Sequence, residues 1–260
     1  MQKITSKDNS IVKKIIKLNK SAKTRNTEGL FVTEGTRLCL EALKSKFVIE
    51  YVCFSESFYS RSYDICLKFK EKCQCFIFSD SLFANICDTQ SPQGVLCVIK
   101  TLDKHQYSGT IKLGGKILTL ENLQDPNNMG TILRTAEAFG IDTIVLTSNC
   151  CDIYSPKVVR GSMGAIFRQE FLITDDLPNL LINYNRYATS YAAVLDSTSV
   201  PVTEVDFCQN CMAIIGNEGN GITKQVADLS THKIIIPMAG GAESLNAAIA
   251  SSILMWEMVR

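Results

Sequence analysis

Residues 121–130, ENLQDPNNMG, form a polar loop whose groups could bind an anion. Asp, Pro and Asn favour a tight turn, and Gly130 permits a close approach of the backbone to a ligand. Arg134 lies about one turn into the helix predicted for residues 131–139. Exposed amides at the start of a helix suit an anion, and an arginine one turn further along suits a phosphate. Taken alone, however, this stretch is better explained as an ordinary strand-to-helix turn with a surface arginine.

A second loop, IIGNEGNGIT at residues 214–223, places Glu218 among three glycines directly after an apolar run. A glycine loop by itself is weak evidence for a site. A glutamate between glycines is more specific, because glutamate is a poor choice for an unconstrained turn. The glycine order is G-x-x-G-x-G, which differs from the G-x-G-x-x-G fingerprint of dinucleotide-binding folds, and the sequence has no G-x-x-x-x-G-K-[ST] phosphate loop. The loop is therefore a candidate site outside both of these nucleotide-binding classes.

The third polar loop, PMAGGAESLN at residues 237–246, precedes an apolar segment that we predict to be a helix from about Ser244 to Arg260. Ser244 is predicted to cap this helix by accepting an amide hydrogen bond. Asn246 would then lie in the first turn, where a ligand could reach its side chain. Capping accounts for Ser244 alone, so the other polar residues of the loop require a second explanation.

The elements around these loops are predicted to form a parallel sheet. From residue 116 onward, short apolar strands such as 116–121, 143–147 and 211–216 alternate with helical segments. This alternation is typical of a parallel sheet that helices cover on both faces. Ligands of such sheets bind beyond the carboxyl ends of the strands, which is where the three loops occur.

Residues 1–104 are predicted to form a separate, small α/β domain. It begins with a helix near Asn9 or Ser10 that has an apolar face and a basic face. Residues 105–115 are polar, contain glycine and show no periodicity, which predicts a linker. Residues 116–260 then form the parallel-sheet domain, so the predicted fold class is α/β throughout.

Positive charge is concentrated at the start of the chain. The formal net charge is only +1, but residues 1–25 contain eight Lys or Arg and a single Asp. Such a basic segment suggests a polyanion as partner, although a solvated helix face explains it equally well. Lys13, Lys14 and Lys17, on the first predicted helix, are the candidate contacts to that polyanion.

Composition argues against export, membrane insertion and metal binding. The first residues are charged throughout and lack the apolar centre and cleavage site of a signal peptide, and no run approaches the ~18 apolar residues of a membrane span. We therefore expect a cytoplasmic protein whose eleven cysteines are thiols. Only Cys208 and Cys211 have metal-ligand spacing, and no second C-x-x-C pair complements them. His105 and His232 add no ligand spacing, so we predict no metal site.

Taken together, the three loops resemble the motifs of a known enzyme family. The first reads N-x-x-x-P-x-N-x-G-x-x-x-R from Asn122 to Arg134, the second I-G-N-E-G, and the third I-P-M followed by E-S-L-N. This ordered set resembles the SpoU/TrmH family of RNA ribose 2′-O-methyltransferases, part of the SPOUT superfamily, over residues 115–260. The N-terminal stretches ITSKDNSIVKKIIKL and GLFVTEGTRLCLEAL are similar to that family's substrate-binding domain, whose fold is akin to certain ribosomal proteins.

The resemblance implies a deep trefoil knot in the C-terminal domain, with loops that hold S-adenosylmethionine in a bent form, largely through backbone groups. An apolar slot with a few backbone hydrogen bonds also suits an adenine ring. The implied cofactor-binding residues are Gly216, Ile236, Met238 and Leu245. The implied catalytic residues are Asn128, Arg134, Glu218, Ser244 and Asn246. The RNA-binding candidates are Lys13, Lys14, Lys17, Arg160 and Arg168, although surface ion pairs explain the two arginines equally well.

The family's reaction transfers a methyl group from a sulfonium to a ribose 2′-hydroxyl, which the protein must orient and make more nucleophilic. The family assigns this activation to the residue that matches Arg134. Because arginine hardly deprotonates, stabilising developing alkoxide charge or holding the adjacent phosphate is physically easier than acting as a general base. Glu218 and the polar pair of the third motif would orient Arg134 and the ribose.

Family members are dimers in which each active site is completed across the interface. The terminal segment NAAIASSILMWEMVR is consistent with this, since small and apolar residues occur around most of its circumference. A fully buried core helix in a monomer would show the same pattern. Two residues depart from the usual motifs: Asn127 stands where many relatives have glycine, and Ala247 stands where valine is usual.

The leading hypothesis is therefore S-adenosylmethionine-dependent methylation of a ribose 2′-hydroxyl in structured ribosomal RNA. Transfer RNA is the alternative substrate, and the two-domain layout favours ribosomal RNA. A non-catalytic RNA-binding or ribosome-assembly protein of the same fold is the alternative from another class, which the joint presence of the five implied catalytic residues opposes. A nicotinamide-dependent Rossmann enzyme is opposed by the missing glycine fingerprint.

Overall fold

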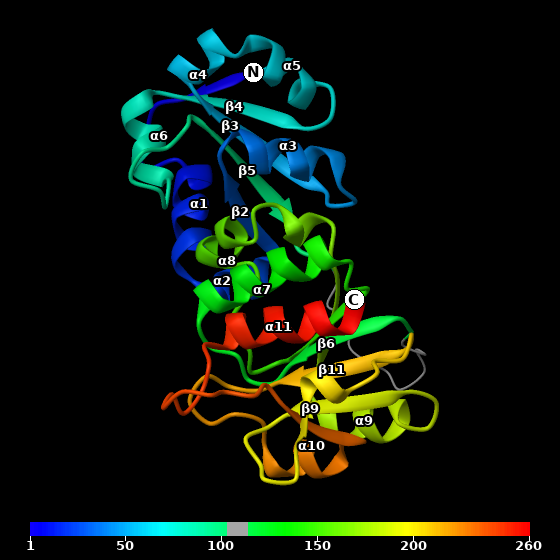
Figure 1. The fold of residues 1–260 in the computed structure, drawn as a ribbon. Helices are drawn as coiled ribbons and strands as arrows, with labels where there is room; N and C mark the ends of the chain where they lie inside the picture. The colour runs from blue at the N-terminus through cyan, green and yellow to red at the C-terminus, as the bar shows by residue number, and fades with distance from the viewer. Residues whose placement is uncertain (103–113) are drawn as a thin grey trace. The chain divides into compact units, whose positions relative to one another are not determined.

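The computed structural model describes residues 1–102 and 114–260 (Figure 1). Most of the predicted linker, 105–115, lies outside the described residues, as does His105. The described part of that segment begins at Gly114, two residues before the first strand of the parallel sheet.

The chain folds into two compact units. The described part of the first unit comprises residues 1–102 and 152–167, and that of the second comprises 114–151 and 168–260. Residues 152–167 therefore group with the N-terminal part of the chain, although the sequence places them inside the predicted domain 116–260. The domain boundaries drawn from the sequence stay a prediction.

The first unit is built on a mixed five-stranded sheet in the order β1-β4-β3-β5-β2. Strands β1, β4 and β3 run parallel, whereas β5 is antiparallel to both β3 and β2. The strands are β1 (Gln2–Ile4), β2 (Leu30–Glu34), β3 (Ile49–Ser55), β4 (Gln74–Phe78) and β5 (Val95–Lys100). The helices are α1 (Ser10–Lys20), α2 (Ala22–Glu28), α3 (Thr36–Lys44), α4 (Glu56–Arg61), α5 (Tyr63–Lys70), α6 (Asp80–Ile86) and α8 (Pro156–Gly161).

Helix α1 confirms the predicted amphipathic start of the chain. Asn9 caps it, accepting a hydrogen bond on Oδ1 from the amide of Ile11 at 2.8 Å. Lys13 and Lys17 are exposed on its outer face. The buried residues on its inner face are Val12, Ile15 and Leu18. The spacing of these side chains therefore produces the predicted apolar and basic faces.

Residues 152–167 are held in the first unit by an ion pair and by ring packing. The Nε of Arg25, a buried side chain, lies 2.7 Å from Oδ2 of Asp152. The ring of Phe31 on β2 packs against Tyr154 with a centroid separation of 4.6 Å. Because buried charges are stable only when paired and hydrogen-bonded, these contacts make the segment an integral part of this unit.

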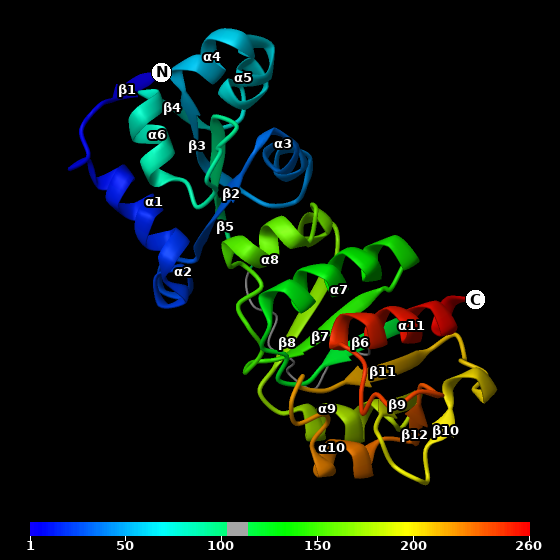
Figure 2. The same cartoon turned by 60° about the vertical axis from the view of Figure 1, so that its left-hand side comes forward.

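The second unit confirms the predicted parallel sheet. Seven strands follow the order β10-β12-β9-β11-β6-β7-β8, and every neighbouring pair is parallel. Helices α7 and α11 lie on one face, and α9 and α10 lie on the other (Figure 2). The strands are β6 (Lys116–Leu120), β7 (Thr143–Thr147), β8 (Glu170–Thr174), β9 (Thr189–Ala193), β10 (Val200–Pro201), β11 (Cys211–Ile215) and β12 (His232–Ile235). The helices are α7 (Pro126–Phe139), α9 (Leu177–Tyr184), α10 (Lys224–Leu229) and α11 (Ala247–Val259).

Helix α7 begins five residues earlier than predicted, at Pro126. Asp125 caps it, accepting on Oδ1 from the amide of Asn127 at 2.8 Å. Proline is favoured at the first helical position, so the Asp-Pro pair starts a helix here rather than only a turn. Asn128 therefore lies in the first turn, and Arg134 lies about two turns into the helix.

Three general properties of the described ranges bear on function. No helix within them is long and apolar enough to cross a membrane. No group of three or more His, Cys, Asp or Glu side chains in these same ranges could hold a metal ion. All eleven cysteines lie within these ranges, and none of them is in a disulfide.

Candidate active site

Three loops of the second unit meet at the carboxyl edge of its sheet. They are the β6–α7 loop (residues 121–125), the β11–α10 loop (216–223) and the β12–α11 loop (236–246). Strands β6 and β11 are adjacent and parallel, so their loops leave the sheet side by side. This is the edge at which parallel α/β sheets bind ligands.

Glu218 joins the β11–α10 loop to the β6–α7 loop. Its Oε2 accepts from the amide of Gln124 at 3.0 Å, and its Oε1 accepts from the amide of Asp125 at 2.8 Å and from Nδ2 of Asn128 at 3.1 Å. Burial alone would raise the pKa of this carboxyl. Hydrogen bonds from these three groups and from its own backbone amide outweigh burial and hold the pKa below its ordinary value, so Glu218 is a carboxylate at neutral pH.

Asn128 and Asn246 extend this chain of hydrogen bonds to the third loop. Asn246 donates from Nδ2 to Oδ1 of Asn128 at 2.9 Å. Asn128 is only 6% exposed, so both ends of its side-chain amide are used inside the protein. The structure therefore brings together three of the five predicted catalytic residues, Asn128, Glu218 and Asn246.

Asn246, not Ser244, caps helix α11. Its Oδ1 accepts from the amides of Ala248 at 2.9 Å and Ile249 at 3.3 Å. The helix begins at Ala247, three residues later than predicted. The predictions that Ser244 caps this helix and that Asn246 lies in its first turn are therefore wrong. Asparagine caps as well as serine does, and only its longer side chain also carries an amide that can reach another loop.

The β11–α10 loop closes on itself. Asn217 and Gly221 exchange two backbone hydrogen bonds, of 3.0 and 2.9 Å. The Nδ2 of Asn217 also donates to the carbonyl of Asn122 at 2.8 Å, which fastens the loop to the β6–α7 loop. A Cβ at Gly216 would overlap backbone atoms of Gly221 and Ile222, so only glycine fits there.

A cavity of about 520 Å³ lies between the β11–α10 and β12–α11 loops. Its size suits a ligand as large as a nucleoside, for which pockets run from about 300 to 1,000 Å³. The predicted cofactor-binding residues Gly216, Ile236, Met238 and Leu245 all line it, as do Glu218 and Ser244. Apolar side chains combined with the glycine-rich backbone fit S-adenosylmethionine, which has an adenine ring to bury and polar groups to hydrogen-bond.

Arg134 does not belong to this group of side chains. It is exposed on α7, about 120° around the helix axis from Asn128. Among the residues that the structure describes, Arg134 is not one of those that line the cavity. The predicted role of Arg134 in catalysis therefore requires another structural element that brings the substrate to this side chain.

Four of the five predicted RNA-binding residues take part in ion pairs. In the first unit, Nζ of Lys13 lies 3.0 Å from Oδ1 of Asp8, and Nζ of Lys14 lies 3.1 Å from Oε2 of Glu28. In the same unit, Nη1 of Arg160 lies 2.6 Å from Oδ2 of Asp88. In the second unit, Arg168 lies 2.8 Å from Glu137. Lys17 is exposed on α1. Each such surface ion pair contributes about 0–1 kcal/mol to stability, so an RNA phosphate can replace its acidic partner. RNA contact by these residues stays a prediction.

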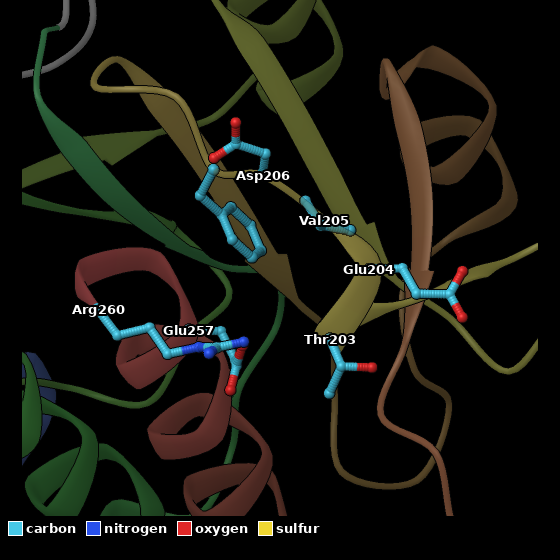
Figure 3. Close-up of a pocket in the computed structure, with 7 residues that line it drawn as sticks. Thr203, Glu204, Val205, Asp206, Glu257 and Arg260 are labelled. Carbon is cyan, nitrogen blue, oxygen red and sulfur yellow. The ribbon is translucent and has the colours of Figure 1, made fainter.

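A second hollow, of about 360 Å³, lies beside the end of helix α11 (Figure 3). It contains none of the predicted site residues. Arg260 is paired with Glu257 at 2.6 Å, and the carboxylates of Glu204 and Asp206 point away from each other (Figure 3). Because its polar groups do not converge on one point, the hollow is not a second candidate site.

Several polar residues that build the site were not among the predicted ones. Asn122 and Asn217 fasten two loops together, and buried Glu121 binds Thr223 with both carboxylate oxygens. One signal for Glu121 is present in the sequence, where an acid ends the apolar strand KILTL. The partner of that acid lies 102 residues away, and nothing in local periodicity points to it.

Comparisons with known proteins agree with this geometry. An uncharacterized tRNA/rRNA methyltransferase of Synechocystis is 34% identical over 99% of this chain and 93% of its own. The 23S rRNA (guanosine(2553)-2′-O)-methyltransferase of Bacillus subtilis is 28% identical over 99% of both chains. The AdoMet-bound rRNA methyltransferase from Sinorhizobium meliloti has a similar structure, with a TM-score of 0.87 at 26% identity over 99% of this chain and 97% of that one.

Two family models match the chain. The MRM3-like substrate binding domain matches residues 9–97, and the SpoU rRNA Methylase family matches residues 115–256. The resemblance drawn from the three ordered motifs is thereby confirmed. Since the second match covers more than half of the chain, the protein belongs to the SpoU rRNA Methylase family.

Proposed function

We propose that this protein transfers a methyl group from S-adenosylmethionine to a ribose 2′-hydroxyl of ribosomal RNA. The observation that carries the proposal is the hydrogen-bonded chain Glu218–Asn128–Asn246 beside a cavity of nucleoside size. The Bacillus subtilis relative, named for this reaction on 23S rRNA, and the AdoMet-bound Sinorhizobium meliloti structure support it.

The cavity supplies the cofactor site in this proposal. Ile236, Met238 and Leu245 present apolar surface for an adenine ring, and Gly216 lets the backbone approach closely. When bound, the cofactor supplies an electrophilic methyl group on a sulfonium. Ser244, exposed at the edge of the cavity, lies where a second substrate can reach it.

Arg134 acts on the ribose in this proposal. Arginine keeps its proton, so it stabilises negative charge that develops on the 2′-oxygen, or holds the adjacent phosphate, in preference to acting as a base. The polar groups of Glu218 and Asn128 are used in the hydrogen bonds between loops described above, so their role is to keep the reaction site rigid.

We further propose a homodimer in which the partner's surface completes each site. Helix α11 exposes three large apolar side chains: Ile249 at 52%, Trp256 at 53% and Val259 at 36%. Trp256 packs on Phe139 of α7, with ring centroids 5.7 Å apart, so α7 and α11 share this surface. Apolar area on two packed helices is typical of a protein interface, and it would also bring the exposed Arg134 of α7 close to a second chain.

A deep trefoil knot is part of the same proposal. Helix α11 follows β12, which lies near one edge of the sheet, yet it packs against α7 and against β6 and β11 in the sheet's middle. The chain must therefore return across the sheet after β12. This path, together with membership of the family, supports the threading implied by the resemblance.

Ribosomal RNA is favoured over transfer RNA by the N-terminal part of the chain. The match to the MRM3-like substrate binding domain covers residues 9–97. Exposed lysines such as Lys17 on α1 would bind phosphates, so RNA affinity should fall steeply as salt is raised. We propose a cytoplasmic location because that is where such RNA is found in a bacterial-type cell.

The decisive experiment combines cofactor binding with methylation mapping. Calorimetry should detect S-adenosylmethionine binding, and ribosomal RNA from cells lacking the gene should gain one 2′-O-methyl group when the purified protein and cofactor are added. Failure to bind the cofactor would favour the non-catalytic RNA-binding alternative. If only transfer RNA is methylated, the proposed reaction stands and the substrate is transfer RNA in place of ribosomal RNA.

A further inference from the structure

Glu121, at the carboxyl end of β6, is a buried carboxylate bonded to one distant residue. It is 4% exposed. Its Oε2 accepts from the amide of Thr223 at 2.9 Å, and its Oε1 accepts from Oγ1 of Thr223 at 2.7 Å. Its own amide donates to the carbonyl of Ile215 at 2.8 Å. Glu121 therefore holds the residue before the β11–α10 loop and the last residue of that loop.

The loop held in this way carries much of the site. Gly216 lines the cavity, Asn217 is fastened to Asn122, and Glu218 receives the amides of the β6–α7 loop. These contacts form only when both ends of the loop, at the end of β11 and at the start of α10, are held in fixed positions. Glu121 and Thr223 set the distance between those two points.

Stability alone does not explain a carboxylate at this position. Glu121 is 4% exposed, so its acid group is almost wholly removed from water. Burying a carboxylate costs free energy, and replacing buried charges with apolar residues of similar volume is often neutral or stabilising. What an apolar side chain cannot do is accept two hydrogen bonds from Thr223.

We propose that Glu121 is a positioning residue for the cofactor site, acting through Thr223 on the β11–α10 loop. This inference rests on the proposed function, because it names S-adenosylmethionine as the ligand. Glu121 does not line the cavity, so within the described residues its effect on the cofactor passes through the loop.

Four variants test the two hydrogen bonds between Glu121 and Thr223: two variants break them and two preserve them. Glu121→Ala breaks both bonds, and Thr223→Val breaks the hydroxyl bond and the cap of α10. Glu121→Gln keeps the link, since its carbonyl accepts from the Thr223 amide and its NH₂ donates to the hydroxyl oxygen. Thr223→Ser also keeps it. Gln169→Leu is the matched control, because it removes a buried hydrogen bond to the carbonyl of Ile141 elsewhere in the same unit.

The test measures S-adenosylmethionine affinity by calorimetry and amide hydrogen exchange across residues 216–223, on folded protein well below its melting temperature. We expect Glu121→Ala and Thr223→Val to weaken cofactor binding about tenfold or more and to speed exchange in this loop. Glu121→Gln, Thr223→Ser and Gln169→Leu should bind within about threefold of the unsubstituted protein. RNA affinity should be unchanged in all five variants.

The outcomes distinguish this inference from the proposed function. If the unsubstituted protein does not bind S-adenosylmethionine, the proposed function fails, and the role of Glu121 toward that cofactor fails with it. If the unsubstituted protein binds and Glu121→Ala binds equally well, the inference alone is overturned. Equal weakening in Gln169→Leu would also overturn it, since the effect would then follow from lost stability.

Discussion

The side-chain amide of Asn246 donates to Oδ1 of Asn128 at 2.9 Å, across 118 residues of sequence. Asn246 at the same time caps α11, and Asn128 at the same time donates to Glu218. The β11–α10 loop, the start of α7 and the start of α11 are thus held in one arrangement by two side-chain amides. This link is the geometric basis of the site.

A double-mutant cycle should measure this link. Asn246→Ala should lower the free energy of unfolding by about 1–2 kcal/mol, through loss of the cap and of the bond to Asn128. Asn246→Asp keeps the cap and removes only the Nδ2 donor. With Asn128→Ala, chemical denaturation should give a coupling energy of about 0.5 kcal/mol or more. Strict additivity of the two substitutions would contradict a shared role.

Acid should weaken the contribution of Glu218 to stability. Its pKa is lowered in the folded state, so its contribution is fully present above the pKa of the unfolded chain and is lost as the pH falls through the lower, folded value. Glu218→Gln should be less stable than the unsubstituted protein at neutral pH, and this difference in the free energy of unfolding should narrow as the pH falls below the ordinary glutamate pKa of about 4.3. Urea unfolding of both proteins over this pH range measures the difference in the free energy of unfolding. A difference that is constant with pH would argue against a paired carboxylate.

Gly216 should tolerate no side chain. In Gly216→Ala the new Cβ overlaps the backbone of Gly221, so the loop must move and cofactor affinity should fall about tenfold or more. Gly219→Ala is the matched control, because its Cβ would meet only Oδ1 of Asn217 at an ordinary 3.6 Å. Calorimetric titration of both variants with S-adenosylmethionine decides the matter, and similar affinities would show that the loop adapts.

Arg134 should matter for turnover and not for stability. It is exposed, so Arg134→Ala should change the free energy of unfolding by no more than about 0.5 kcal/mol. Loss of a charge-stabilising group should lower kcat about 100-fold or more. Arg186→Ala, at another exposed arginine of the same unit, provides the control. Near-normal turnover together with undiminished RNA affinity in Arg134→Ala would exclude both proposed roles.

The apolar surface of α11 should govern oligomeric state. Ile249→Glu places a charge in the proposed interface and should give a monomer at micromolar concentration. Ile182→Glu is the control, since Ile182 is 46% exposed on α9, on the opposite face of the sheet. Light scattering after size-exclusion chromatography reports the mass. A monomeric unsubstituted protein would remove the dimer from the proposal.

Local patterns predicted much of the fold because they report local forces. The alternation of apolar strands and helices predicted the parallel sheet, and the polar loops after those strands predicted the edge at which the site lies. The starts of α7 and α11 were misplaced, because several residues near each start can cap a helix and the choice depends on contacts elsewhere. Residues 152–167 fall within the predicted domain 116–260, whereas their place in the first unit depends on contacts with Arg25 and Phe31.

By itself, the sequence determined the α/β class, the order of the three motifs and the residue types that a methyltransferase site needs. Tertiary structure alone decided their partners: Glu218 with Asn128, Asn128 with Asn246, and Glu121 with Thr223. It also separated Arg134 from them. The reason is that periodicity reports which face of an element is buried, whereas a hydrogen bond requires two groups to lie about 3 Å apart in a suitable direction. That condition is met only when distant parts of the chain have packed together.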